Sequence, residues 1–126
     1  MARQKVVNVF ATDVDGLHQN TEAERAVNQW GALVGNGEGP SGLSYAIPVY
    51  NSEGKVRPIE QLRGPIRRFL EYASKNKKTI FKVSRLGCDL FGYDDFDVAP
   101  YFTNAPDHVI LPVGWRTHFQ DYRNKI

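Results

Sequence analysis

The sequence holds a single cysteine and only three histidines. One cysteine, Cys88, cannot form an internal disulfide, and the scattered histidines do not have the spacing of a zinc site. A lone thiol of this kind is typical of a small buried side chain, because a nucleophilic cysteine needs a base beside it. We therefore expect neither a bound metal nor a cofactor.

Long apolar runs are also missing. No stretch approaches the roughly 20 apolar residues that cross a bilayer. The first ten residues, MARQKVVNVF, lack the apolar region of a secretory signal. These absences predict a cytoplasmic protein that does not contact membranes.

An excess of charge of one sign is absent as well. Sixteen basic residues balance fourteen acidic ones, for a formal net charge of +2. Such a balance does not favour a general attraction to nucleic acid. The local basic clusters, at residues 63–68 and 75–78, are typical of the solvated face of a helix and its exit. We expect no nucleic-acid partner.

The composition that remains is that of a folded protein. Hydrophobic residues make up 41% of the chain and charged residues 24%, without repeats or low-complexity segments. A chain of 126 residues can bury one substantial core but not two. We expect a single domain over residues 1–126, in which residues 115–126 form a docking tail.

Short apolar runs alternate with helical patterns along this domain. Strands are expected at residues 6–11, 43–50, 79–84 and 108–112, and helices at 20–31, 57–76 and 94–102. This alternation is typical of an α/β fold in three layers, with a mainly parallel sheet and helices on both faces.

Local signals refine these elements. Thr21 with Glu24 forms a capping-box pattern that predicts the start of the first helix, and Gly31 predicts its end. Pro65 fits the first turn of the second helix, where its missing N–H costs little. The glycine-rich residues 35–42 predict a loop, and Pro48 disfavours a place for its segment in the middle of a sheet.

Three loops are expected to meet at one edge of the sheet, namely residues 11–20, 35–45 and 84–95. In parallel α/β folds ligands bind beyond the carboxyl ends of the strands, where loops converge. Asp13 and Asp15 follow the first strand, so they can bind a ribose hydroxyl or an adenine amino group, or cap a turn. Asp89 can equally bond a ligand or cap loop N–H groups.

The loop after the third strand carries most of the other candidates. Gly87 and Gly92 either let the backbone approach a phosphate or only permit a tight turn. Arg85 can pair with a phosphate, or with one of the nearby aspartates. Tyr45, Phe91 and Tyr93 can stack on a base or fill the edge of the core. These alternatives stay open at the level of sequence.

Residues 37–115 resemble a family of small phage and bacterial proteins. The motifs SYAIP, RLGCDLFGY and VAP occur in the family's order and spacing, where the family pattern reads SYAIP, IGCGLAGY and IAP. That family is in turn similar to macrodomains, which bind ADP-ribose and its derivatives. The resemblance implies a macrodomain-like fold.

The macrodomain resemblance also implies site residues. Two glycine-rich turns embrace the ligand in those folds; Gly16 and His18 match the first. The second is matched by Arg85, Leu86, Gly87, Cys88, Gly92 and Tyr93. This chain departs from the pattern where HQNTEAE replaces HGxGAA and where Asp89 and Phe91 replace a glycine and an alanine. A carboxylate at position 89 repels a pyrophosphate unless a cation intervenes.

Three functions follow as expectations. The first is binding, and sequestration, of a small nucleotide related to ADP-ribose, in a phage protein that counters host immune signalling in the host cytoplasm. The second is hydrolysis of an ADP-ribose ester or glycosidic bond, with Asp13, Asp15, His18 or Asp89 handling protons. No spacing identifies a catalytic pair, so the catalytic residues are unknown.

The third function is protein contact without a small ligand. Trp115, Phe119 and Tyr122 have spacings compatible with one helical face. This face can pack on the protein's own core or on a second copy, so a homo-oligomer is an expected partner alongside the small nucleotide.

Overall fold

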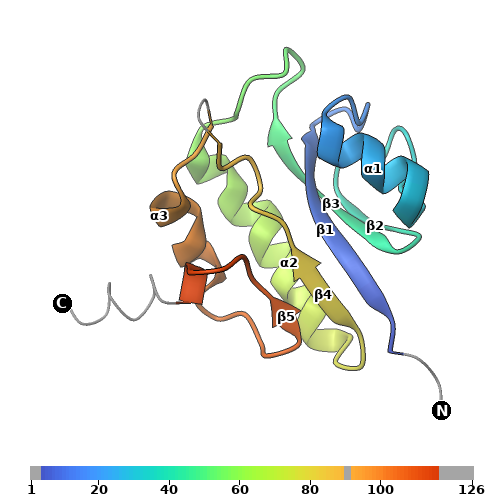
Figure 1. Cartoon of the computed structure of the whole chain (residues 1–126). Helices are drawn as coiled ribbons and strands as arrows, with labels where there is room; N and C mark the ends of the chain where they lie inside the picture. Colours follow the sequence, from blue (N-terminus) through green and yellow to red (C-terminus); the bar gives the residue numbers. More distant parts are fainter. Residues whose placement is uncertain (1–3, 90–91, 117–126) are drawn as a thin grey trace.

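A five-stranded sheet organises residues 4–89 and 92–116, which are the residues that this computed structural model describes (Figure 1). The strands are β1 (Val6–Asp13), β2 (Gly39–Ser41), β3 (Ser44–Tyr50), β4 (Ile80–Val83) and β5 (Val109–Ile110). The α-helices are α1 (Thr21–Trp30), α2 (Arg63–Lys75) and α3 (Asp95–Val98), and 3-10 turns lie at η1 (Ile59–Leu62) and η2 (Ala99–Phe102).

The sheet is mixed but mostly parallel. Its strand order is β2-β3-β1-β4-β5, and β1 pairs in parallel with both β3 and β4. β5 is parallel to β4, whereas β2 is antiparallel to β3. The prediction of an α/β fold with a mainly parallel sheet is therefore confirmed.

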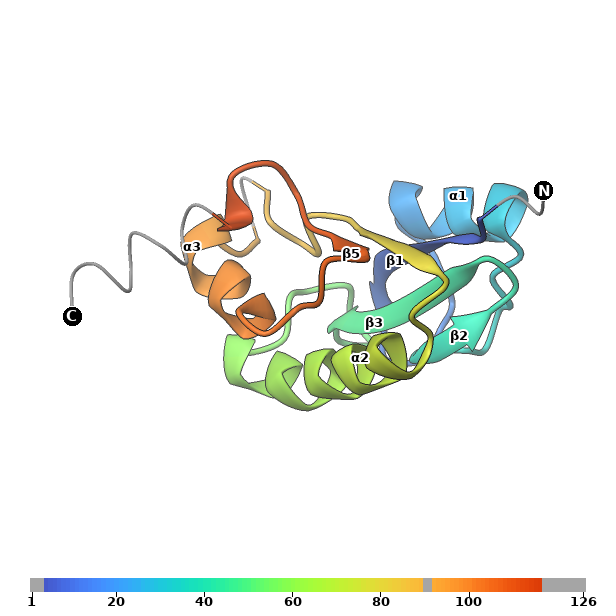
Figure 2. The ribbon, with the colours of Figure 1, turned by 90° about the horizontal axis from the view of Figure 1, so that it is seen from below.

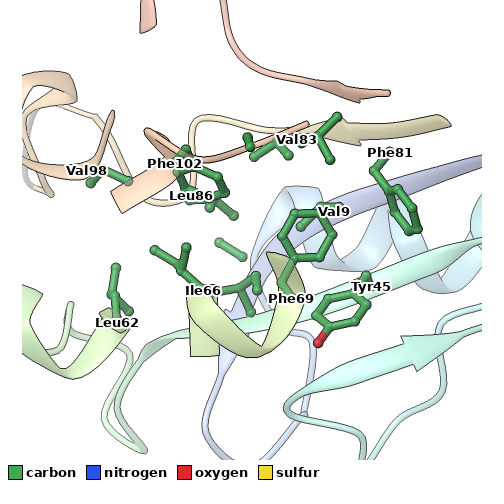
Figure 3. Packing of buried hydrophobic residues seen from close by; sticks show 14 of the residues in the cluster. Val9, Tyr45, Leu62, Ile66, Phe69, Phe81, Val83, Leu86, Val98 and Phe102 are labelled. Atoms are coloured by element: carbon green, nitrogen blue, oxygen red, sulfur yellow. The ribbon is translucent and has the colours of Figure 1, made fainter. Parts of the chain in front are cut away.

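Helices pack on both faces of the sheet. In Figure 2, α1 lies on one side and α2 on the other. Neighbouring residues of β1 point to opposite faces, so Val9 joins the core beneath α2 and Phe10 joins the smaller core beneath α1. Figure 3 shows the larger core, where Phe69 of α2 meets Tyr45 and Phe81 from two strands.

The start of α1 corrects the sequence prediction. The N-cap is Asn20, whose side chain accepts the N–H of Ala23 at 2.8 Å, and not Thr21. Asn20 has the extended backbone that an N-cap requires, and this places Thr21 inside the helix. The end at Gly31 is confirmed, because Gly31 is the left-handed C-cap with a φ of 75°.

Two predictions for the β2 and β3 region are wrong. Residues 39–41, expected in a loop, form an edge strand, where a proline is tolerated. β3 lies inside the sheet in spite of Pro48, because β2 pairs only with Ser44–Ala46 and leaves the outer side of Pro48 without a strand. The carbonyl of Pro48 instead accepts a hydrogen bond from Arg57 Nη1 at 2.7 Å.

The last described residues pack against the core. Trp115 is 1% exposed, and its indole N–H donates to Asp95 Oδ1 at 2.7 Å. Phe119 and Tyr122, expected on the same helical face, lie outside the described residues. In the part of the chain that the structure describes, none of the helices has the length and apolarity of a bilayer span.

Candidate functional site

The segments that follow β1, β3 and β4 meet at Tyr50, the last residue of β3. We call this surface the strand-end rim. One hollow of ≈ 220 Å³ is lined by Asp13, Leu17, Gln19, Asn20, Tyr50, Asn51, Ser52 and Gly54. A second, of ≈ 530 Å³, is lined by Tyr50, Gly54, Lys55, Val56, Asp89 and Gly92. Because both hollows include Tyr50 and Gly54, they adjoin, and segments remote in the sequence meet here.

Asp13 builds the turn that follows β1. Its carboxylate accepts the N–H groups of Asp15 and Leu17 at 3.0 Å and of His18 at 3.1 Å. Partial burial alone raises the pKa of Asp13, but these backbone N–H groups outweigh it and hold the pKa below its ordinary value. Asp13 therefore both caps the turn and lines the smaller hollow, while Asp15 is exposed beside it.

His18 lies beneath the rim and does not line either hollow. It is 3% exposed and stacks edge-on against Phe10. Nε2 lies 2.7 Å from the Leu33 carbonyl, to which it must donate because a carbonyl only accepts, and Nδ1 lies 2.7 Å from the Thr12 hydroxyl. The two ring nitrogens thus link the end of β1 to the residues after α1.

The two glycines after β4 are needed for the turn itself. Gly87 has a φ of 83°, and a Cβ there would lie 2.7 Å from Val49 Cγ1. A Cβ on Gly92 would lie 1.9 Å from the Gly87 carbonyl oxygen. The N–H of Tyr93 donates to this same carbonyl at 2.9 Å, which closes the turn. This closed turn positions Asp89 and Gly92, which line the larger hollow.

Arg85 and Cys88 do not line either rim hollow. Arg85 makes a two-point contact with Asp95, with Nη2 at 2.6 Å from Oδ2. Of the two predicted partners of Arg85, a phosphate or a nearby aspartate, the structure shows the aspartate. Cys88 is 4% exposed. Burial, with the carboxylate of Asp95 as a smaller cause, raises the pKa of the Cys88 thiol to about 12. The thiol is therefore protonated at neutral pH and unsuited to nucleophilic attack.

The predicted stacking tyrosines do not line the rim hollows. Tyr45 pairs with Val9 in the sheet and packs on Phe69 in the core, where burial raises its pKa to about 12. The hydroxyl of Tyr93 donates to the Arg57 carbonyl, and burial raises its pKa to about 12 as well. Phe91 lies outside the described residues.

Tyr50 is the aromatic residue at the rim, and sequence reasoning missed it. Its pKa is raised by burial and then by the charge of Asp89. Its position at the end of the strand SYAIPVY was the available signal, because the carboxyl ends of parallel strands carry ligand sites. The pairing of Tyr50 with Asp13 across β1 and β3 sets this position.

Side chains of α1 and its N-cap bind the backbone of β1 where β4 no longer pairs with it. The strands part after Val9, whose carbonyl accepts the Ser84 N–H at 3.0 Å. Beyond this point, Ala11 donates its N–H to Glu22 Oε1 at 3.2 Å and accepts Asn20 Nδ2 at 3.1 Å. Burial raises the pKa of Glu22, partly offset by a hydrogen bond with the Ser84 side chain. Sequence reasoning missed Glu22 as well.

In comparisons with family models, curated proteins and solved structures, nothing matches this chain. The resemblance to macrodomains therefore stays a prediction. Among residues 4–89 and 92–116, no group of three or more histidine, cysteine or acidic side chains could hold a metal ion.

The glycine turn after β4 can be tested with Gly92→Ala. We expect a loss of about 1–3 kcal/mol in the free energy of unfolding, because the new methyl group overlaps the Gly87 carbonyl. Gly64→Ala in α2 is the control, since only the flexible end of Arg68 lies near its Cβ and alanine favours a helix by about 0.5–1 kcal/mol. Urea unfolding measures both; an unchanged stability in Gly92→Ala contradicts the proposed need for glycine.

The turn after β1 predicts a pH-dependent stability. The folded pKa of Asp13 is depressed, so its contribution is present above the ordinary value of 3.8 and is lost as the pH falls through the folded value. Asp13→Ala should cost about 0.5–2 kcal/mol at pH 7, as for other lost caps, and much less in strong acid. Urea unfolding at both pH values checks this, with the exposed Asp15→Ala as control. An equal cost at both pH values contradicts it.

Proposed function

We propose that this protein binds a small nucleotide related to ADP-ribose at the strand-end rim. The observation that carries the proposal is the meeting of three chain segments around Tyr50, with adjoining hollows on its two sides. The location supports it too, since α/β folds bind ligands beyond the carboxyl ends of their strands. The proposal also implies that the fold is a three-layer, macrodomain-like arrangement.

The chemistry of the rim suits a nucleoside. Tyr50 offers an aromatic ring for a base, and the carboxylate of Asp89 can accept ribose hydroxyls. Lys55 lines the same hollow as Asp89 and supplies the cation that a phosphate needs. In this arrangement the sugar lies near Asp89 and a phosphate lies near Lys55, away from the carboxylate that repels it.

Binding without turnover is the form of the proposal that the residues favour. Cys88 is buried with a raised thiol pKa, and both nitrogens of His18 are engaged in hydrogen bonds within the protein. Neither is therefore ready to act as a nucleophile or a base at the rim. Sequestration of a signalling nucleotide in the cytoplasm needs affinity alone, which the rim can provide.

A thermal-shift screen tests the proposed ligand class. We expect ADP-ribose, a cyclic ADP-ribose isomer or a cyclic dinucleotide to stabilise the protein, by about 2.7 kcal/mol at 100 times the dissociation constant. Tyr50→Ala should weaken binding of the active compound about 5- to 150-fold, the value of one stacked base. Tyr50→Phe keeps the ring and should bind nearly as well. No shift with any compound, or equal binding by Tyr50→Ala, contradicts the proposal.

Asp89→Asn tests which part of the ligand faces the turn after β4. The change weakens an acceptor for ribose hydroxyls and also removes a charge that repels a diphosphate, so adenosine should lose more affinity than ADP-ribose. Isothermal titration with ADP-ribose and adenosine measures the two changes. A fall in affinity for ADP-ribose alone would mean that Asp89 contributes to diphosphate binding, opposite to the expected repulsion.

A further inference from the structure

A groove separate from the rim hollows runs between α1 and β4. It has a volume of ≈ 470 Å³, and its lining includes Glu22, Arg25, Trp30, Lys82 and Ser84. Lys82 reaches it because the flanking Phe81 and Val83 are buried in the core beneath α2, and alternate residues of a strand face opposite ways. The groove is therefore on the α1 face of the sheet, which Figure 2 shows opposite α2.

Two cations from different elements line this groove. Arg25 projects from α1 and Lys82 from β4, and both side chains are exposed. The ion pairs of the described residues are Arg68 with Glu38 and Arg85 with Asp95, so neither groove cation is in one. Glu22 accepts the N–H of Ala11, and the charge of Arg25 also acts on it and partly offsets the rise in the pKa of Glu22 that burial causes. The groove lining thus carries two positive groups and one carboxylate, that of Glu22.

Trp30 adds an aromatic surface to the same groove. It is the last residue of α1 and is only partly buried against the small core beneath that helix. An indole ring stacks on aromatic bases and contributes about 1–3 kcal/mol per base. A cavity of this volume is within the range of small-ligand sites, about 300–1,000 Å³.

We propose that the α1–β4 groove is a second binding site, for a nucleoside monophosphate. The base stacks on Trp30, and Arg25 and Lys82 bind the phosphate from the two walls. A free nucleotide fits better than a nucleic acid strand, because strand binding requires cations along a continuous track and the groove presents two. The proposal does not rest on the function proposed for the strand-end rim.

Glu22 sets a limit on the affinity of this groove. Its carboxyl group lines the groove near the carboxyl ends of β1 and β4 and, when ionised, repels a phosphate. Glutamine keeps the oxygen that accepts the Ala11 N–H but removes the charge. Glu22→Gln should therefore bind the nucleotide more tightly than the wild-type protein.

Tryptophan fluorescence reads this site directly. Trp30 lines the groove, whereas Trp115 is 1% exposed and bonded to Asp95. We expect adenosine monophosphate to quench the emission, with adenosine and inorganic phosphate each binding more weakly. Trp30→Phe, which retains Trp115, should lose the quenching while its thermal unfolding stays cooperative.

Exposed charge variants keep the test valid if Trp30→Phe does not fold. Arg25→Ala and Lys82→Ala should each raise the dissociation constant of adenosine monophosphate about tenfold, the value of one charge-assisted contact. Lys78→Ala, an exposed lysine outside the groove lining, should leave it unchanged.

Four results overturn the second site. They are no quenching at millimolar adenosine monophosphate, equal affinity in Arg25→Ala and Lys82→Ala, tighter binding of a single-stranded oligonucleotide than of the mononucleotide, and loss of the quenching in Tyr50→Ala. The last result assigns the nucleotide to the rim instead. Conversely, a rim that binds no ligand leaves the quenching by adenosine monophosphate as a separate measurement.

Discussion

The structure depends on which groups pair with the backbone of β1 beyond Val9, where β4 no longer runs beside it. A parallel strand that loses its neighbour exposes backbone groups that must find other partners. Here Glu22 accepts the N–H of Ala11, and Asn20 donates to its carbonyl while also capping α1. These bonds join the first turn of α1 to the centre of the sheet. The rim hollows and the α1–β4 groove consequently lie on two sides of one fixed helix start.

The two candidate sites differ in their charge. Asp13 and Asp89 line the strand-end rim with Lys55 as the cation, whereas Arg25 and Lys82 line the groove with Glu22 as the anion. An acidic rim favours hydroxyl groups of a ligand, and a basic groove favours its phosphate. The near-neutral composition of the chain hides this division, because opposite local excesses cancel in the sum.

Sequence patterns predicted the elements well, but they predicted the site only in part. Short apolar runs placed β1, β3 and β4, since a strand that is buried on both faces consists of nearly continuous apolar residues. The predictions for Pro48 and for residues 39–41 were wrong because the cost of a proline in a sheet depends on whether a neighbouring strand pairs at that position. Tyr50 and Glu22 were missed because their importance comes from contacts across the fold. His18 and Tyr45 were expected at the ligand, yet packing holds both in the interior.

The lone thiol beside the β4 turn has a practical consequence. Cys88 is covered by neighbouring residues and stays protonated. Alkylating reagents, which react with the thiolate, therefore react slowly with the native protein. Cys88 lies within the turn that the bond from Tyr93 to Gly87 closes, so we expect opening of this turn to expose the sulfur. The rate of alkylation at this sulfur thus reports how often the turn after β4 opens locally, and no engineered label is needed.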